Sequence, residues 1–111
     1  TEGLVIVKES GRACVKLMPD VFHMNIEDAS FREAFEAGED YITYVHVADS
    51  NRLAPGWGHL CFDEIFAILA DIGYQGYLTA EILPQPDPDA AAAQAACYLL
   101  AKLGRPAPSR P

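Results

Sequence analysis

Apolar and polar residues form two kinds of pattern along the chain. Three short blocks rich in apolar, β-branched and aromatic residues predict β-strands. Around these blocks, apolar residues recur at intervals of three and four, which predicts helices. The expected strands cover residues 14–18, 41–49 and 76–83, and the expected helices cover residues 4–9, 28–40, 61–73 and 90–103.

The alternation of strands and helices predicts a parallel sheet with right-handed crossovers. Parallel sheets are covered by helices on both faces or close into a barrel. Three strands cannot close a barrel, because an eight-stranded (β/α) barrel needs about 250 residues. The chain is therefore either a small three-layer sandwich or a piece of a larger fold. The first block, which reads as the end of a helix before Gly11, favours a piece.

Composition and charge narrow the function classes. The 111 residues are half apolar, which predicts one folded domain, and the net charge of −8 disfavours nucleic acid and anionic membranes as partners. No apolar run approaches the roughly 20 residues of a membrane span, and the N-terminus has no signal-peptide pattern, so we expect a cytoplasmic protein. The three scattered cysteines are expected to be reduced, buried thiols. We expect residues 105–111 to form a disordered tail.

Polar side chains stand at the end of each expected strand. Asp20 follows the first strand, the second carries His46 and then Asp49, and Glu81 lies near the end of the third. The carboxyl ends of parallel strands meet at one edge, where ligands bind in βα proteins. Carboxylate and imidazole donors suit Mn²⁺, Mg²⁺, Co²⁺ or Zn²⁺. The pattern therefore predicts a metal site at this edge.

Each of these residues also has a purely structural interpretation. Asp20 is equally well a helix cap or turn residue, and His46 alone is more often a hydrogen-bonded core histidine. Arg52, in the loop after the second strand, is by itself a solvated loop residue. Glu81 is harder to explain in this way, because a carboxylate in an apolar strand is costly unless it is paired or metal-bound.

Three stretches carry a resemblance to a known family. "DVFHMNIED", "HVADSNRLAPGWGH" and "GYQGYLTAEILPQPDP" resemble the sugar-phosphate isomerase/epimerase group of xylose-isomerase-like TIM barrels, and most of all the ketose 3-epimerases of the D-tagatose/D-psicose type. The resemblance spans about residues 2–103. It implies an α/β fold, the C-terminal portion of a (β/α)8 barrel, in which three parallel strands alternate with four helices. Residues 1–104 would then hold the last three βα units.

The resemblance also implies roles for single residues. Asp20, His46 and Glu81 would be metal ligands, for Mn²⁺ in the first place and for Mg²⁺, Co²⁺ or Zn²⁺ as alternatives. Glu81 would also be a catalytic carboxylate, and His23 and Arg52 would bind the substrate. The family's other catalytic glutamate, which also binds the metal, lies on an earlier strand that would precede this chain. The segment would thus supply three of four metal ligands.

One residue departs from the family pattern. Pro19 precedes the expected metal ligand Asp20, where a small or aliphatic residue is expected. A proline is tolerated at a strand end but can change the path of the strand.

The implied reaction is the epimerisation of a ketose sugar at C3 through an enediolate, in which a proton leaves one face of the carbon and returns to the other. Whether the chain is an enzyme by itself stays open, because it lacks the first half of the barrel. One alternative is another isomerase of the superfamily, of the hydroxypyruvate isomerase or inosose dehydratase type. The other is a non-catalytic half-barrel that forms a homo-oligomer or pairs with a complementary half. An endonuclease IV-type repair enzyme is disfavoured, because no Asp-x-His pair stands between His46 and Glu81.

Overall fold

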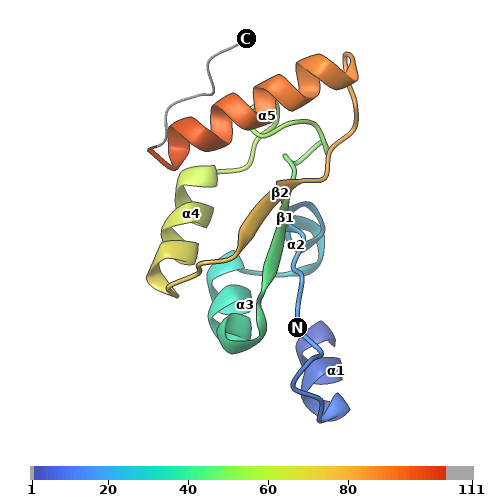
Figure 1. The fold of residues 1–111 in the computed structure, drawn as a ribbon, viewed down its shortest axis with the longest axis vertical. Helices are drawn as coiled ribbons and strands as arrows, with labels where there is room; N and C mark the ends of the chain where they lie inside the picture. Colours follow the sequence, from blue (N-terminus) through green and yellow to red (C-terminus); the bar gives the residue numbers. More distant parts are fainter. Residues whose placement is uncertain (1, 105–111) are drawn as a thin grey trace.

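The computed structural model describes residues 2–104, which form helices around two parallel strands (Figure 1). The terminal tail expected at residues 105–111 lies outside the described residues. Helices α1 and α5 lie at opposite ends of the molecule, with the strands between them. In chain order the elements are α1 Glu2–Ser10, α2 Val21–Glu27, α3 Phe31–Gly38, the 3₁₀ turn η1 Glu39–Tyr41, β1 Tyr44–Val47, α4 Phe62–Asp71, β2 Tyr77–Ala80 and α5 Pro88–Lys102.

The strands β1 and β2 pair in parallel, with a register that runs from Tyr44 opposite Tyr77 to Val47 opposite Ala80. On the other side of β1, residues 17–20 run beside it and make two isolated parallel bridges, Leu17 to Ile42 and Asp20 to His46. The predicted order of three extended segments is therefore present. Only two of them are regular strands among residues 2–104.

The strand predicted at residues 14–18 is wrong. At its start the chain turns, with the Val15 N–H donating to the Arg12 carbonyl at 3.1 Å, and at its end Pro19 stops the pairing that begins at Leu17. The Leu17 N–H donates to the Tyr41 carbonyl at 2.8 Å, as in a parallel ladder. Pro19 has no N–H to continue this ladder. Its carbonyl accepts from the His46 N–H at 2.9 Å, and the pairing shifts by one residue between the two bridges.

A fifth α-helix, α2, adds to the four that the sequence pattern predicts. Its N-cap is Asp20, whose Oδ1 accepts hydrogen bonds from the N–H groups of Phe22 at 2.9 Å and His23 at 3.4 Å. The helix has seven residues, which is too short for an apolar periodicity to be visible. Its start is visible only as an aspartate after an extended segment.

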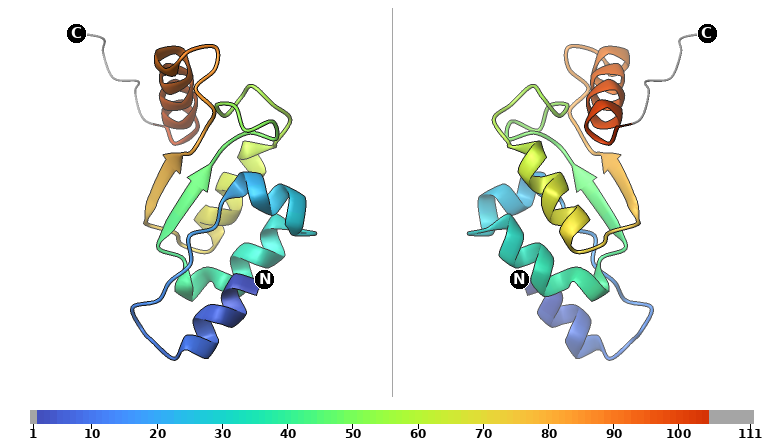
Figure 2. Two further views of the ribbon diagram at one scale, coloured as in Figure 1. Left: turned by 90° about the vertical axis from the view of Figure 1, so that its right-hand side faces the viewer. Right: turned by 90° about the vertical axis from the view of Figure 1, so that its left-hand side faces the viewer.

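The core lies between the sheet and the helices α2, α3 and α4. Val45 and Val47 are fully buried, whereas Tyr44 and His46 on the opposite face of β1 are only partly buried. Helix α4 lies behind the strands in the left-hand view of Figure 2 and in front of them in the right-hand view. The side chains of the core are Val21, Met24, Phe35, Val45, Val47, Phe62, Ile65, Ile68 and Leu69.

The expectation of buried cysteines is wrong. Cys14, Cys61 and Cys97 are free thiols, as predicted, but all three are exposed. Cys61 is the N-cap residue of α4 and so precedes the helical turns whose apolar face is buried. Within residues 2–104, no helix has the length and apolar character needed to cross a membrane.

Candidate metal centre

Three side chains from distant parts of the chain meet at one edge of the sheet. Asp20, His46 and Glu81 each offer a donor atom, and these three atoms lie within 4.8 Å of one another. The Nδ1 atom of His46 lies 3.9 Å from Oδ2 of Asp20 and 3.7 Å from Oε2 of Glu81. The structure thus brings together the three residues predicted as metal ligands.

Backbone pairing explains why these side chains converge. The Asp20–His46 bridge places the first two side by side, and the N–H of Glu81 donates to the Val47 carbonyl at 3.1 Å just after β2 ends. All three residues therefore lie at the carboxyl ends of neighbouring extended segments. This is the edge at which βα folds place their ligands.

The donor set fits a divalent cation. Metal bonds of about 2.0–2.2 Å to nitrogen and oxygen let two ligands of one ion lie up to about 4.2 Å apart, so separations of 3.7 and 3.9 Å are compatible with a shared ion. The side chains of Asp20 and His46 are 12% and 19% exposed, whereas that of Glu81 is 50% exposed. The candidate site has a half-buried floor and one solvent-facing carboxylate.

Arg52 joins Asp20, His46 and Glu81, and these four side chains form a charged cluster. Nη2 of Arg52 donates to Oε2 of Glu81 at 2.9 Å, and its guanidinium lies 5.0 Å from the centre of the Phe22 ring. Hydrogen bonding with Asp20, and then with Arg52, lowers the pKa of Glu81, so this carboxylate is ionised at neutral pH. Arg52 is paired with Glu81 and is not a freely solvated loop residue.

The structure bears differently on the structural interpretations of Asp20, His46 and Glu81. Asp20 is a helix cap through Oδ1, as its structural interpretation predicts, while its Oδ2 faces His46. His46 is partly exposed, which differs from the environment of a core histidine. Glu81 follows β2 and is half exposed, so the cost of burying it inside a strand does not arise.

His23, predicted to bind substrate, lies on α2 and is exposed. It is not one of the three converging donors. Its ring meets the Phe22 ring edge to face, with centroids 5.2 Å apart. Phe22 thus contacts both residues predicted to bind substrate, His23 and Arg52. Phe22 could not be predicted from the sequence, because a single aromatic residue inside "DVFH" does not show which way its side chain points.

The loop after β1 is organised by a buried carboxylate, Asp49, which is 1% exposed. Oδ1 accepts from the N–H groups of Ser50 at 2.8 Å and Leu60 at 3.0 Å, and Oδ2 accepts from Gly56 N–H at 2.8 Å. Burial raises the pKa of Asp49, but the backbone N–H donors outweigh burial and leave the pKa below its usual value. Its position at a strand end was visible in the sequence, but its hydrogen bonds were not.

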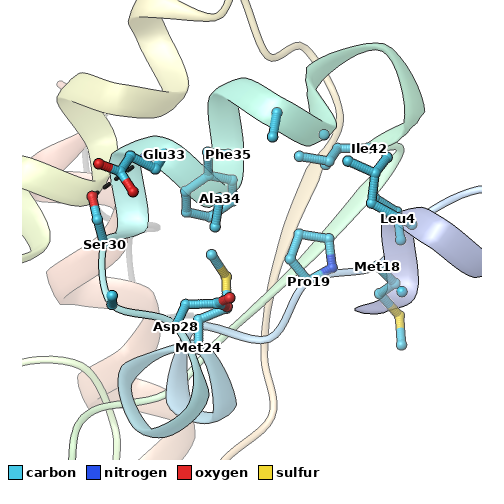
Figure 3. Close-up of a pocket in the computed structure, with 15 residues that line it drawn as sticks. Leu4, Met18, Pro19, Met24, Asp28, Ser30, Glu33, Ala34, Phe35 and Ile42 are labelled. Carbon is cyan, nitrogen blue, oxygen red and sulfur yellow. Dashed lines mark hydrogen bonds between the residues drawn. The ribbon is translucent and has the colours of Figure 1, made fainter. Parts of the chain in front are cut away.

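An apolar pocket of about 460 Å³ lies elsewhere, among α1, α2 and α3 (Figure 3). Leu4, Met24 and Phe35 line it from these three helices. None of the residues of the charged cluster lines this pocket. The charged cluster and this pocket are therefore separate parts of the described structure.

The fold and the strand-end cluster together define an α/β chain of the TIM-barrel type. The xylose isomerase-like TIM barrel family matches residues 1–102, and the chain belongs to this family. The predicted α/β, TIM-barrel fold class is thereby confirmed, with the local changes in strand and helix described above.

Individual relatives point to sugar epimerases. The chain is 41% identical over 80 residues to D-psicose 3-epimerase of Agrobacterium fabrum, which covers 72% of this chain and 28% of that enzyme. It is 38% identical over 80 residues to L-ribulose 3-epimerase of a Methylomonas species, with coverage of 72% and 28%. A solved structure of L-ribulose 3-epimerase superimposes with a TM-score of 0.85 at 29% identity, over 93% of this chain and 41% of that one. The chain spans less than a third of the length of these two curated relatives.

Proposed function

We propose that this chain supplies the C-terminal segment of a metal-dependent ketose 3-epimerase. The observation that carries the proposal is the convergence of Asp20, His46 and Glu81 at the strand ends, with their donor atoms within 4.8 Å of one another. The similarity to D-psicose and L-ribulose 3-epimerases supports a sugar epimerase of this kind. The substrate is accordingly a small ketose.

The metal would be held by Asp20, His46 and Glu81. Two carboxylates and one imidazole form a mixed oxygen and nitrogen donor set, which suits Mn²⁺ first and Mg²⁺, Co²⁺ or Zn²⁺ as alternatives. A divalent cation bound there supplies positive charge against the negative charge that develops on the substrate oxygens when the C3 proton leaves.

Glu81 moves the proton at C3. It is ionised, and half of its side chain faces solvent, so a substrate C–H has access to it. Arg52 lies against the same carboxylate and would offer its remaining N–H donors to sugar oxygens. His23 stands three residues after Asp20, in the first turn of α2. Arg52 and His23 would fix the sugar so that the C3–H bond points at Glu81.

The remaining parts of the site would come from other units of the barrel. Epimerisation needs a second proton-transfer group on the opposite face of C3, and the family resemblance places it, with the fourth metal ligand, on an earlier strand. Two apolar pockets flank the segment, one among α1, α2 and α3 and one of about 580 Å³ among β2, α4 and α5. We expect further barrel units, a complementary half or a second copy of the chain to cover them.

A hybrid enzyme tests this proposal. The segment of 80 residues aligned in D-psicose 3-epimerase of Agrobacterium fabrum is replaced by the matching residues of this chain. We expect the hybrid to interconvert D-psicose and D-fructose with Mn²⁺. Glu81→Gln in the hybrid is expected to lower turnover about 10²–10⁴-fold, since it removes a proton-transfer group.

Glu64→Gln, which changes an exposed glutamate of α4, is the matched control and should leave turnover unchanged. A panel of ketoses and hydroxypyruvate separates C3 epimerisation from the alternative isomerase activities. A folded hybrid that binds Mn²⁺ but exchanges no C3 proton with solvent would contradict the proposed function.

A further inference from the structure

We propose that the buried carboxylate of Asp49 positions Arg52 against Glu81 and so sets how firmly this metal-binding carboxylate is held. Asp49 itself would touch neither metal nor substrate. The inference deepens the proposed function, on which its metal site rests, and makes Asp49 a positioning residue of that site.

The loop after β1 gathers around the Asp49 carboxylate. Backbone N–H groups from Ser50, Gly56 and Leu60, which are far apart along the loop, converge on one fully buried carboxylate. A buried carboxylate is tolerated only where such donors replace water. Hydrogen bonds to an ionised acceptor are also stronger than those between neutral groups. The loop path therefore depends on the charge of Asp49.

The loop fits closely against the Asp49 carboxylate and the Tyr98 ring. A Cβ atom added at Gly58 would collide with the Asp49 carboxyl group and with Oγ of Ser50. Gly56 has a φ of +95°, and a Cβ there would lie 2.7 Å from the Tyr98 ring. Neither position has space for a side chain, so the backbone wraps directly onto the carboxylate.

A main-chain hydrogen bond connects Asp49 to Arg52. The Arg52 N–H donates to the Asp49 carbonyl at 2.9 Å, and the Asp49 N–H donates to the Leu53 carbonyl at 3.0 Å. In this tight turn Arg52 has a φ of +62°, a left-handed conformation that is unfavourable for a residue other than glycine. These main-chain bonds join the ends of the turn, and the Asp49 carboxylate fixes the turn from within by accepting from the Ser50 N–H at 2.8 Å. The turn directs the guanidinium onto Glu81, at 2.9 Å.

The contact between Arg52 and Glu81 affects the proposed metal site. Nη2 of Arg52 donates a hydrogen bond to Oε2 of Glu81, the same oxygen that lies 3.7 Å from His46 Nδ1. A bound cation competes with the guanidinium for this oxygen and is repelled by its charge. If Asp49 positions Arg52, loosening Asp49 should release Glu81 and make metal binding by this chain tighter.

A double-mutant cycle with Mn²⁺ as the probe tests the inference. Arg52→Met is expected to raise the Mn²⁺ affinity of the chain about 2–5-fold, the size of one exposed ion pair. Asp49→Asn should also raise the Mn²⁺ affinity, by a smaller factor. In the Arg52→Met background, Asp49→Asn should leave the affinity unchanged. A purely structural role of Asp49 predicts the opposite, a loss of affinity of equal size in both backgrounds, and that result would overturn the proposal.

A second measurement decides the question independently of metal. The Nε–H resonance of Arg52 in an NMR spectrum reports on its contact with Glu81, and Glu81→Gln gives the position of the released guanidinium. We expect Asp49→Asn to move the resonance toward that position. The control, Asp71→Asn, removes an exposed carboxylate that pairs with Arg32 and should leave it in place. An Arg52 resonance unmoved by Asp49→Asn would refute the positioning role.

Two outcomes remain distinguishable. If Asp49→Asn does not fold, Gly58→Ala takes its place, because a Cβ at Gly58 would collide with the same carboxyl group. An Arg52 resonance that Gly58→Ala leaves unmoved would count against the inference. If the parent chain binds no Mn²⁺, the metal part of the proposed function fails, whereas the NMR comparison still answers for Asp49.

Discussion

At the scale of single residues, Asp20 combines a structural and a chemical role by using its two oxygens separately. Oδ1 caps α2 through the N–H groups of Phe22 and His23. Oδ2 faces His46 Nδ1 at 3.9 Å and would be the oxygen that binds the proposed cation. The two roles can therefore be separated by substitution.

Asp20→Ser should keep the helix cap and lose the metal ligand, because serine is a good N-cap residue but a poor ligand for a divalent cation. Asp20→Ala should lose both, at a cost of about 0.5–2 kcal/mol in the free energy of unfolding. Urea unfolding and Mn²⁺ titration of both variants measure the two effects. Mn²⁺ affinity of the parent retained in Asp20→Ser would count against Asp20 as a ligand.

Asp49 predicts an acid dependence of stability. Its pKa is lower in the folded chain than in the unfolded chain, so its contribution is present above the unfolded pKa of about 3.9 and is lost as pH falls through the folded pKa. The difference in unfolding free energy between the parent and Asp49→Asn should thus be largest near pH 7 and shrink below about pH 4. Urea titrations at both pH values check this. A difference that stays constant with pH would show that the charge of Asp49 is unimportant.

At the scale of the elements, α3 and α4 pack their buried side chains into one core with Val45 and Val47 of β1. Ile68 of α4 is fully buried in the core, whereas Ile26 of α2 is 62% exposed. Both are isoleucines in helices, which makes them a matched pair.

Ile68→Ala should lower the unfolding free energy by about 2–5 kcal/mol, because it removes buried methylene groups and leaves a cavity. Ile26→Ala should change it by less than about 0.5 kcal/mol, as is usual at exposed positions. Chemical unfolding of the two variants gives the comparison. Equal losses at both positions would mean that the core does not lie where the structure places it.

The elements that the sequence predicted are those with long, regular patterns. Helix α4 follows from its repeated apolar face, and β1 follows from its β-branched and aromatic residues. Two features could not be predicted in the same way. Pro19 breaks a ladder only because of its partner across the sheet, and α2 is too short to show a period. Both depend on neighbours that are distant in the sequence.

The candidate site was predictable in part for a related reason. The sequence places Asp20, His46 and Glu81 at strand ends, and parallel pairing of these segments then brings the three residues to one edge. The hydrogen bonds of Asp49 and the contacts of Phe22 depend on a loop path and on side-chain direction. Neither of these is encoded in a short motif.

At the scale of the whole molecule, the segment presents apolar surface on both flanks of its sheet. Tyr77 of β2 is 75% exposed, and pockets of about 460 and 580 Å³ lie on the two sides. Exposed apolar surface of this kind marks contacts with further protein. We therefore expect the isolated chain to self-associate, as measured by light scattering coupled to size exclusion. A stable, strictly monomeric species would count against assembly as a requirement.

The central claim is that three strand-end side chains form one metal centre. Paramagnetic Mn²⁺ broadens the NMR signals of the nuclei nearest to it, so a titration of the labelled chain locates the ion directly. We predict that the signals of Asp20, His46 and Glu81 broaden first and that His46→Ala abolishes this pattern at the same Mn²⁺ concentration. Broadening that begins at other acidic residues, or that is unchanged in His46→Ala, would contradict the claim.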